Sequence, residues 1–232
     1  MYIHSAPCPY IPRQTETQAY VALNPSELDY YAEDLNQIGF RRAMNTSYIP
    51  ICASCNSCQS LRVLVNKFRY TSSFKRTLRK NSDVKFSMEK PEVTEENYAL
   101  FQRYVLARHP KNDMETINED YYKRLLKIAP SNTFLLYARD ENDQLLGFSL
   151  VDDFSDGLSA VHSFFDPDMP KRSLGILLVL EMIKRVRKFR KDFLYLGYYI
   201  AETSNMAYKT RFLPLEHFNQ EKETWQEFIR DE

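Results

Sequence analysis

Glycine is scarce in this chain: only 5 of its 232 residues are glycine. So few glycines argue against a repeat architecture and against a glycine-rich loop that cradles phosphate groups. There is also no run of about 20 apolar residues, the length that spans a bilayer, so no membrane segment is expected. The first residues, MYIHSAPCPYIP, lack the charged start and the apolar stretch of a secretory signal. We therefore expect a cytoplasmic protein with no membrane partner.

Neither sign of charge is in excess, because 31 basic residues balance 31 acidic ones. The charges are nevertheless segregated: residues 61–91 contain nine Lys or Arg against two acids, and residues 184–191 contain six basic residues. The basic stretches 67–80 and 184–191 predict local contacts with a polyanion such as RNA. The alternative is that they are ordinary solvated helix faces.

Cysteine is rare, yet three of the four cysteines, Cys52, Cys55 and Cys58, are separated by two residues each. This spacing is typical of iron–sulfur ligands. The remote Cys8 would complete either a four-cysteine cluster or a tetrahedral zinc site. A third interpretation is four reduced thiols, since a reducing compartment disfavours disulfides. The sequence leaves these three alternatives open.

Apolar residues make up 44% of the chain, enough to bury a core, and their periodicity predicts both helices and strands. Helices are expected at 26–40, with Ser26 as the N-cap, and at 72–81, 94–109, 118–129, 173–189 and 205–212. An extended acidic tail is expected after the last of them. Strands are expected at 61–68, 83–90, 157–166, 193–200 and in a hairpin around the polar turn 140–144. The order helix, helix, hairpin, strand, loop-helix, strand in the second half is that of a GNAT-like acyltransferase. We predict an α/β (α+β) fold with a GNAT-like C-terminal catalytic domain at 91–232 and a small Cys-containing N-terminal domain at 1–90.

Several stretches together carry a resemblance to one family. They are CPYIP (8–12), GFRRAMNTSYIPICASCNSCQSLRV (39–63), FQRYVLARH (101–109), DGLSAVHSFFDPDMPKRSLG (156–175) and YLGYYIAETSNMAYKTRFLPLE (195–216). The chain resembles the N-end-rule aminoacyl-tRNA–protein transferases over nearly its whole length. More narrowly, it resembles their short bacterial branch, the aspartate/glutamate leucyltransferases.

The resemblance implies an activity: transfer of an amino acid from aminoacyl-tRNA to the N-terminal α-amine of a protein that begins with Asp or Glu. The new residue marks that protein for N-end-rule degradation. The short bacterial form implies leucine, and hence leucyl-tRNA, whereas longer relatives use arginine. Relatives also keep cysteines in the N-terminal domain, which implies a cluster there.

The chemistry of this transfer makes few demands. Conversion of an ester to an amide is downhill, so no cofactor is required for catalysis, and any metal would be structural or regulatory. An α-amine has a pKa near 8, so a useful fraction is neutral at physiological pH. The enzyme chiefly has to align amine and ester, to stabilise the oxyanion and to accept a proton. The four histidines show no spacing typical of a nucleophile–base pair.

Candidate residues for the donor side follow from the strand-to-helix transition and from the last strand. The segment Arg172, Ser173, Gly175 is a reduced form of the loop with which GNAT domains bind phosphates, so we expect it to hold the 3′ end of the tRNA. Tyr208 and Arg211 are further donor-binding candidates. For catalysis we select three residues: Asp166, Tyr199 and Lys209. The alternatives are an Asp that forms a turn, a core tyrosine and a solvated lysine.

An acidic acceptor requires a cation, and arginine is preferred for bidentate capture of a carboxylate. The candidates for binding the acceptor N-terminus are Arg41, Arg42, Tyr48 and Arg62. Two other functions compete with aminoacyl transfer. One is an acyl-CoA-dependent GNAT N-acetyltransferase, and the other is a non-catalytic module that binds acidic N-termini or RNA.

Overall fold

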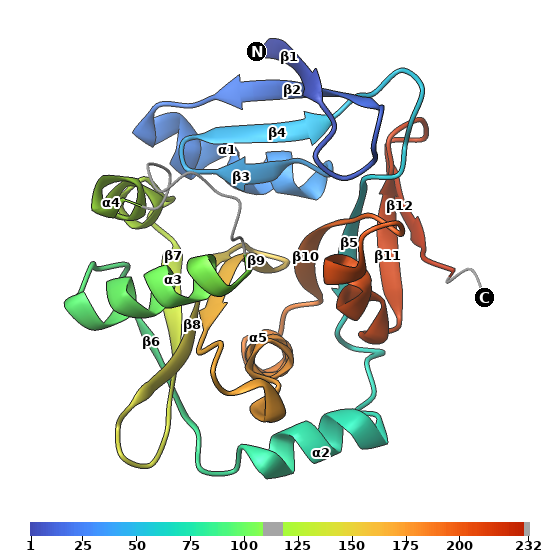
Figure 1. Ribbon diagram of the computed structural model, residues 1–232. Helices are drawn as coiled ribbons and strands as arrows, with labels where there is room; N and C mark the ends of the chain where they lie inside the picture. The colour runs from blue at the N-terminus through green and yellow to red at the C-terminus, as the bar shows by residue number, and fades with distance from the viewer. Residues whose placement is uncertain (109–117, 230–232) are drawn as a thin grey trace.

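The N-terminal part of the chain forms a small antiparallel sheet in this computed structural model, which describes residues 1–108 and 118–229. The strand order is β1 (Tyr2–Pro7), β2 (Thr15–Ala22), β4 (Thr46–Pro50) and β3 (Arg41–Ala43). Helix α1 (Pro25–Gln37) connects β2 to β3. Figure 1 shows this sheet in blue and cyan above the rest of the molecule.

The second sheet has eight strands and extends across the whole molecule. Its order is β12 (Thr224–Glu227), β11 (Leu215–Asn219), β5 (Gln59–Leu64), β10 (Phe193–Tyr199), β9 (Gly157–Phe165), β8 (Leu145–Asp153), β7 (Thr133–Arg139) and β6 (Lys85–Glu89). Strands β5 and β6 precede residue 90 yet pair within this sheet. Sheet membership therefore changes between β4 and β5, earlier than the domain boundary expected at residue 90.

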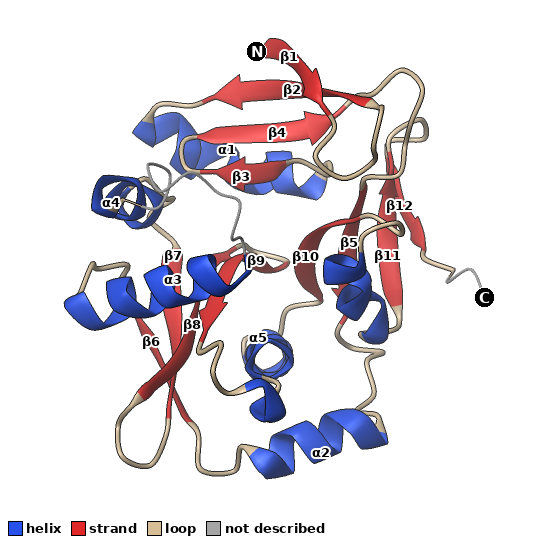
Figure 2. Ribbon diagram, viewed as in Figure 1, coloured by secondary structure: helices blue, strands red, loops and turns tan. Residues whose placement is uncertain are grey.

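Helices cover both faces of the large sheet (Figure 2). Side chains of β7 alternate between the two faces of the sheet. On one face Leu136 packs with α5 (Leu174–Lys188), and on the other Leu135 packs with α3 (Glu95–Arg108) and α4 (Glu119–Lys127). Helix α2 (Ser72–Lys80) packs beside α5. The mixed α/β fold is thus confirmed, with the predicted order of elements from α3 to β10. No helix among the described residues is both long and apolar enough to span a bilayer.

Three details of the secondary structure differ from expectation. The sequence favours Ser26 as the N-cap of the first helix, but Asn24 is the N-cap. Its side chain and that of Glu27 form a reciprocal capping box, and Pro25 occupies the first helical position. The segment expected as a helix at 205–212 is a 3₁₀ helix, η3 (Ser204–Arg211). The acidic C-terminal stretch, expected to be an extended tail, forms the β11–β12 hairpin.

Strands β9 and β10 form the only parallel pair that the described residues contribute to the large sheet, and they pair over three positions only. The last paired residues are Tyr195 and Ser159. Strand β9 continues to Phe165 and β10 to Tyr199 without pairing to each other. The two strands therefore diverge, which leaves backbone groups in the split available for other partners.

A buried ion pair joins the small sheet to the large one. Arg42 on β3 donates from Nε and Nη2 to the two carboxylate oxygens of Asp152 on β8, each at 2.8 Å. The two side chains are 5% and 1% exposed, and Thr133 also donates to Asp152. Arg42 was expected to bind an acceptor carboxylate; this bidentate pair occupies it in a structural role instead.

We predict that Arg42→Ala lowers the free energy of unfolding by about 3–5 kcal/mol, because Asp152 is left as an uncompensated buried charge. Urea unfolding followed by circular dichroism measures this loss. Exposed Lys90→Ala is the control and should stay within about 0.5 kcal/mol of the wild type. The double variant Arg42→Met with Asp152→Leu should recover most of the loss. A cost below about 1 kcal/mol for Arg42→Ala alone would contradict this account.

Candidate active site

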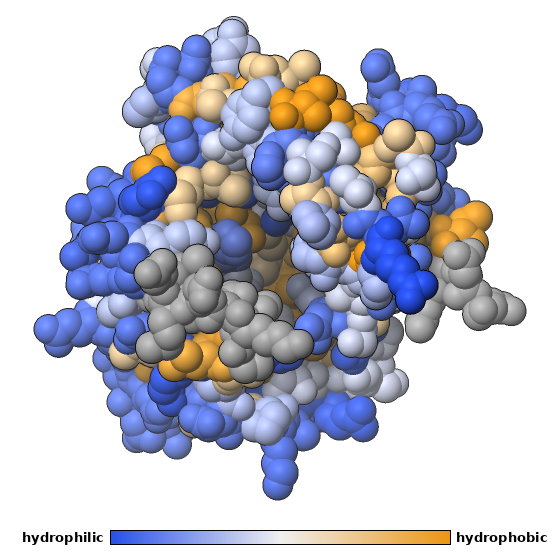
Figure 3. All heavy atoms as spheres, turned by 45° about the horizontal axis from the view of Figure 1, so that its top comes forward, coloured by the Kyte–Doolittle hydropathy of each residue, from blue (hydrophilic) through white to orange (hydrophobic). Residues whose placement is uncertain are grey.

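A cavity of about 640 Å³ opens where β9 and β10 diverge. Strand β9, the start of α5, the end of α3 and η3 contribute its walls. Figure 3 shows that this face of the molecule is hollowed, with apolar residues visible inside the hollow. The apolar lining residues include Val105, Val161, Phe164, Phe165, Leu174, Ile176, Val179, Leu196 and Met206. Four cations also line it: Arg41, Arg108, Lys209 and Arg211.

The Arg41 side chain enters the split between the two strands. It comes from β3 of the small sheet, and its Nη2 donates to the carbonyl oxygen of Ala160 at 2.8 Å. Gly197 on β10 makes room for it: a Cβ there would lie 2.4 Å from Arg41 Nε. Of the four residues expected to bind the acceptor, Arg41 is the one that reaches the cavity.

Lys209 of η3 also lines the cavity, close to the end of β10. Its Nζ donates to the carbonyl oxygen of Tyr198. Burial and the neighbouring positive charge of Arg41 lower the pKa of Lys209 to about 7. Near neutral pH, a substantial fraction of this amine is therefore uncharged and able to accept a proton.

His162 on β9 lines the cavity, although no motif in the sequence singles it out. Burial, followed by the charges of Arg41 and Arg42, lowers the pKa of His162 to about 4. Arg108, at the end of α3, is the second missed residue; its guanidinium lies over the Phe165 ring, 5.5 Å from the centroid. Both residues stand in stretches that carry the family resemblance, and that was the available signal.

The donor-side residues divide into two groups. Ser173, Gly175, Tyr208 and Arg211 line the cavity together. Ser173 precedes α5 without capping it through its side chain, so the amides of the first helical turn lack a side-chain acceptor. Gly175 lets the Phe165 ring approach, since a Cβ there would lie 2.9 Å from that ring.

Arg172 lies outside this cavity. Its Nη2 donates to both carboxylate oxygens of Asp83 at 2.7 Å, and its Nε donates to Asn81 at 2.8 Å. These contacts fix the loop before α5 against the end of α2. Arg172 therefore stabilises this loop. The backbone amides of residues 173–175 remain candidates for binding a phosphate.

Asp166 is also absent from the cavity lining and is only 3% exposed. One carboxylate oxygen accepts the amide of Asp168 at 2.9 Å, and the other accepts from Arg103 at 3.0 Å. This is the turn-forming alternative. Among the three catalytic candidates, only Lys209 lines the cavity.

A bulge in β10 overturns the expected arrangement of its tyrosines. Simple alternation predicts Tyr195 and Tyr199 on one face and Tyr198 on the other. Because the register with β5 shifts between Tyr195 and Gly197, Tyr195 pairs with Arg62 and Tyr198 with Ser60. Tyr195 and Tyr198 therefore share a face, while Tyr199 lies on the opposite one and packs against the core and Phe228.

The other expected acceptor residues lie beyond the cavity walls. Arg62 donates to Glu216 at 2.7 Å and stacks over the Phe193 ring, 3.7 Å from its centroid. Tyr48 packs its ring between those of Tyr20 and Tyr198. Arg62 is thus held in an internal ion pair, and Tyr48 belongs to a tyrosine stack that joins the two sheets.

The four cysteines come together around a separate cavity of about 380 Å³, formed by the loops that carry Cys8 and Cys52–Cys58 together with β11. Cys52 Sγ accepts the Thr17 amide at 3.3 Å, and Cys8 Sγ accepts the Ile11 amide at 3.4 Å. However, within residues 1–108 and 118–229 no three His, Cys, Asp or Glu side chains are arranged to hold a metal ion. In this arrangement they are four thiols near one another, and no step of the chemistry is assigned to a metal.

The family models and the curated relatives agree on one family. The family model described as "Arginine-tRNA-protein transferase, N terminus" matches residues 6–76, and the one described as "Arginine-tRNA-protein transferase, C terminus" matches residues 96–219. The "Aspartate/glutamate leucyltransferase" of Granulibacter bethesdensis is 37% identical over 91% of this chain and 79% of its own length. The protein of the same name from Paramagnetospirillum magneticum is 35% identical over 96% of this chain and 90% of its own length. Among solved structures, a tandem GNAT protein from the clavulanic acid pathway aligns with a TM-score of 0.45 and 12% identity over 87% of this chain and 60% of that one.

We predict that Gly197→Ala lowers kcat/KM at least about tenfold, because its Cβ would displace Arg41 and its φ of +72° disfavours a side chain. A double-mutant cycle with Arg41→Ala isolates the contact. Gly197→Ala should cost less stability in the Arg41→Ala background than in the wild type, as measured by urea unfolding. Strictly additive costs would show that the two residues do not interact.

A second prediction concerns the cysteines. The resemblance implies a structural or regulatory iron–sulfur cluster or zinc there, whereas the described thiols are not arranged to hold a metal ion, so the metal content of the protein tests what the resemblance implies. Protein purified without oxygen should contain iron and sulfide, or zinc, in a fixed ratio to the chain, measured by elemental analysis and absorption spectroscopy. Cys55→Ser should remove that content, whereas Ser57→Ala in the same loop should keep it. A metal-free and fully active wild-type preparation would refute the expectation.

Proposed function

Because the chain belongs to the arginine-tRNA-protein transferase family, it is an aminoacyl-tRNA–protein transferase, and we propose that it moves leucine from leucyl-tRNA to N-terminal Asp or Glu. The single observation that carries the choice of substrates is the composition of the 640 Å³ cavity. Its lining combines apolar residues and cations with uncharged polar residues such as Ser163 and Asn205, and the described part of it contains no carboxylate. Transfer of leucine would mark the acceptor for N-end-rule degradation.

The cavity composition favours leucine over arginine as the transferred residue. A leucyl side chain can bury its apolar surface against residues such as Val161, Phe164 and Leu196, at about 25 cal/mol per Å². An arginyl side chain would enter a space that already holds Arg41 and Arg108, with no carboxylate of the described lining to pair with. Charge repulsion and desolvation then act against an arginyl donor.

The same cations suit an acceptor that begins with Asp or Glu. Arg108 offers an exposed guanidinium at the cavity edge, anchored over the Phe165 ring. Bidentate pairing of a guanidinium with a carboxylate is directional and charge-assisted. Asn or Gln at the acceptor N-terminus would lose this charge, so selectivity for acidic residues follows. We therefore assign Arg108 and Arg41 to the acceptor side, whereas Arg42 and Arg62 keep their internal partners.

Lys209 is the residue that we assign to proton transfer. The neutral acceptor amine attacks the ester carbonyl, and the new C–N bond leaves a positively charged nitrogen. The uncharged Lys209 amine takes one proton from that nitrogen, while its own N–H bond to the Tyr198 carbonyl keeps it in place. The ammonium of Lys209 then returns the proton to the departing ribose oxygen, so the products are an amide and deacylated tRNA.

The donor and acceptor assignment is tested with mixed charged tRNAs and a reporter peptide that begins with Asp. Mass spectrometry of the peptide should show leucine at its N-terminus, and a matched peptide that begins with Asn should react at least about tenfold less. Labelled acetyl-CoA should give no product. Acetylation of the peptide, or addition of arginine in preference to leucine, would refute the proposal.

The role of Lys209 predicts a specific pH profile. In the wild type kcat should rise as the pH passes through about 7, because only the deprotonated lysine can accept the proton. Lys209→Met should reduce kcat by about 100-fold and remove that step from the profile. Lys209→Arg should not rescue activity, since it keeps the charge but cannot act as a base. Substantial rescue by arginine would show that the positive charge is what matters.

A further inference from the structure

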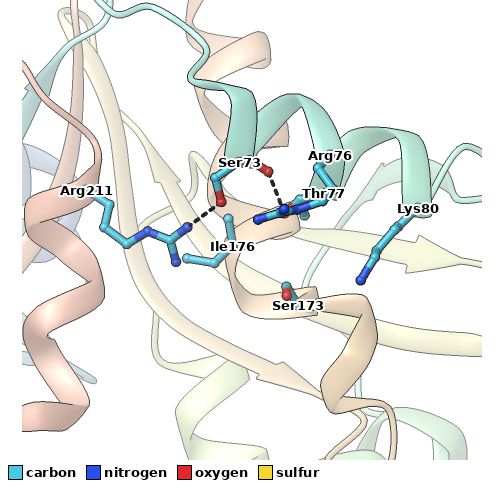
Figure 4. Close-up of a pocket in the computed structure, with 7 residues that line it drawn as sticks. All are labelled: Ser73, Arg76, Thr77, Lys80, Ser173, Ile176 and Arg211. Carbon is cyan, nitrogen blue, oxygen red and sulfur yellow. Dashed lines mark hydrogen bonds between the residues drawn. The ribbon is translucent and has the colours of Figure 1, made fainter.

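A smaller pocket of about 280 Å³ lies beside the active-site cavity, between α2 and the start of α5. It is lined by Ser73, Arg76, Thr77, Lys80, Ser173, Ile176 and Arg211. Figure 4 shows that the first four of these residues come from α2 and that Arg211 reaches across from η3. Three of the seven are cations and three carry hydroxyl groups, the combination of donors that a phosphate group requires.

The cations of this pocket have no acidic partner among residues 1–108 and 118–229. Arg211 Nη2 donates only to the Ser73 hydroxyl, at 3.0 Å, and Lys80 Nζ donates to the Lys171 carbonyl at 3.3 Å. The nearby Arg172 is different, because Asp83 neutralises it. Positive charge is therefore concentrated in the pocket without a neutralising group, in a concave site where it attracts an anion.

The pocket adjoins the active-site cavity directly: Ser173, Ile176 and Arg211 line both. In a charged tRNA the amino acid is esterified to the terminal ribose, and the nearest anion is the phosphodiester that links this nucleoside to the preceding one. Only the terminal ribose separates the ester from that phosphodiester, so an ester in the larger cavity would bring the phosphodiester to the adjoining pocket.

We propose that the pocket formed by Arg76, Lys80 and Arg211 binds the phosphodiester that precedes the terminal nucleoside of the donor RNA. This inference rests on the proposed function, because it assumes an RNA ester in the neighbouring cavity. It assigns the recognition of the first phosphate to α2, in the basic stretch 67–80, rather than to Arg172.

Two minimal donor substrates isolate the contribution of this phosphodiester from that of the rest of the RNA. The first is leucine esterified to adenosine, which has no phosphate. The second is leucine esterified to the dinucleotide cytidylyl-adenosine, which has one phosphodiester. For the wild type, kcat/KM should be higher for the dinucleotide. In Arg76→Gln the ratio of dinucleotide to nucleoside kcat/KM should fall about tenfold, the loss expected for one charge-assisted hydrogen bond. Arg79→Gln, on α2 but outside the pocket, should keep the wild-type ratio.

Binding of the uncharged dinucleotide and of adenosine, measured by calorimetry, gives a readout that does not depend on transfer. The wild type should bind the dinucleotide more tightly than adenosine, and Arg76→Gln should lose this preference. Equal binding of both compounds by the wild type, or an unchanged preference in Arg76→Gln, overturns the phosphate pocket. Preference for the dinucleotide without any leucyl transfer keeps the pocket and refutes the proposed function instead.

Discussion

The split between β9 and β10 is the constraint on which the site depends. Parallel pairing that ends at Tyr195 and Ser159 leaves Ala160 and Val161 without a partner on β10, and Arg41 donates to the carbonyl oxygens of both. Unpaired backbone acceptors in a buried position are costly, so a long cationic donor at this point stabilises the opening. Arg41 comes from the small sheet. The position of that sheet and the shape of the cavity are therefore coupled through one side chain.

The same guanidinium sets the chemistry of its neighbours. Its positive charge, added to burial, disfavours a second cation nearby and lowers the pKa of Lys209 and of His162. A lysine that would be solvated and charged on the surface becomes a base near neutral pH. With the roles proposed above, the cavity combines an apolar wall for a leucyl side chain, cations for an acidic acceptor and an uncharged amine for the proton, and Arg41 lies next to all three.

Much of the fold follows from the sequence because its signals are local. The apolar periodicity of α5 and of β7 to β9 predicts these elements, and the order of elements in the second half gives the fold class. The bulge in β10 could not be predicted in the same way. Alternation of side chains assumes a regular strand, and the shift near Gly197 depends on pairing with β5, more than 130 residues earlier in the chain. Simple alternation therefore predicts the wrong faces for Tyr198 and Tyr199 relative to Tyr195, although it predicts the strand itself correctly.

The roles of the arginines could not be predicted from local sequence either, because each role depends on whether a carboxylate lies nearby in the fold. Arg41 and Arg42 are adjacent in sequence, yet Arg42 meets Asp152, 110 positions away, while Arg41 enters the cavity. Arg172 and Arg211 are both basic residues near helix ends, but Asp83 neutralises only the former. Whether an arginine is available to a ligand is decided by the carboxylate that tertiary folding brings to it, and no local motif encodes that carboxylate. An arginine in a family motif therefore identifies the region of the site, and its ion-pair partner decides whether it belongs to the scaffold or to the substrate.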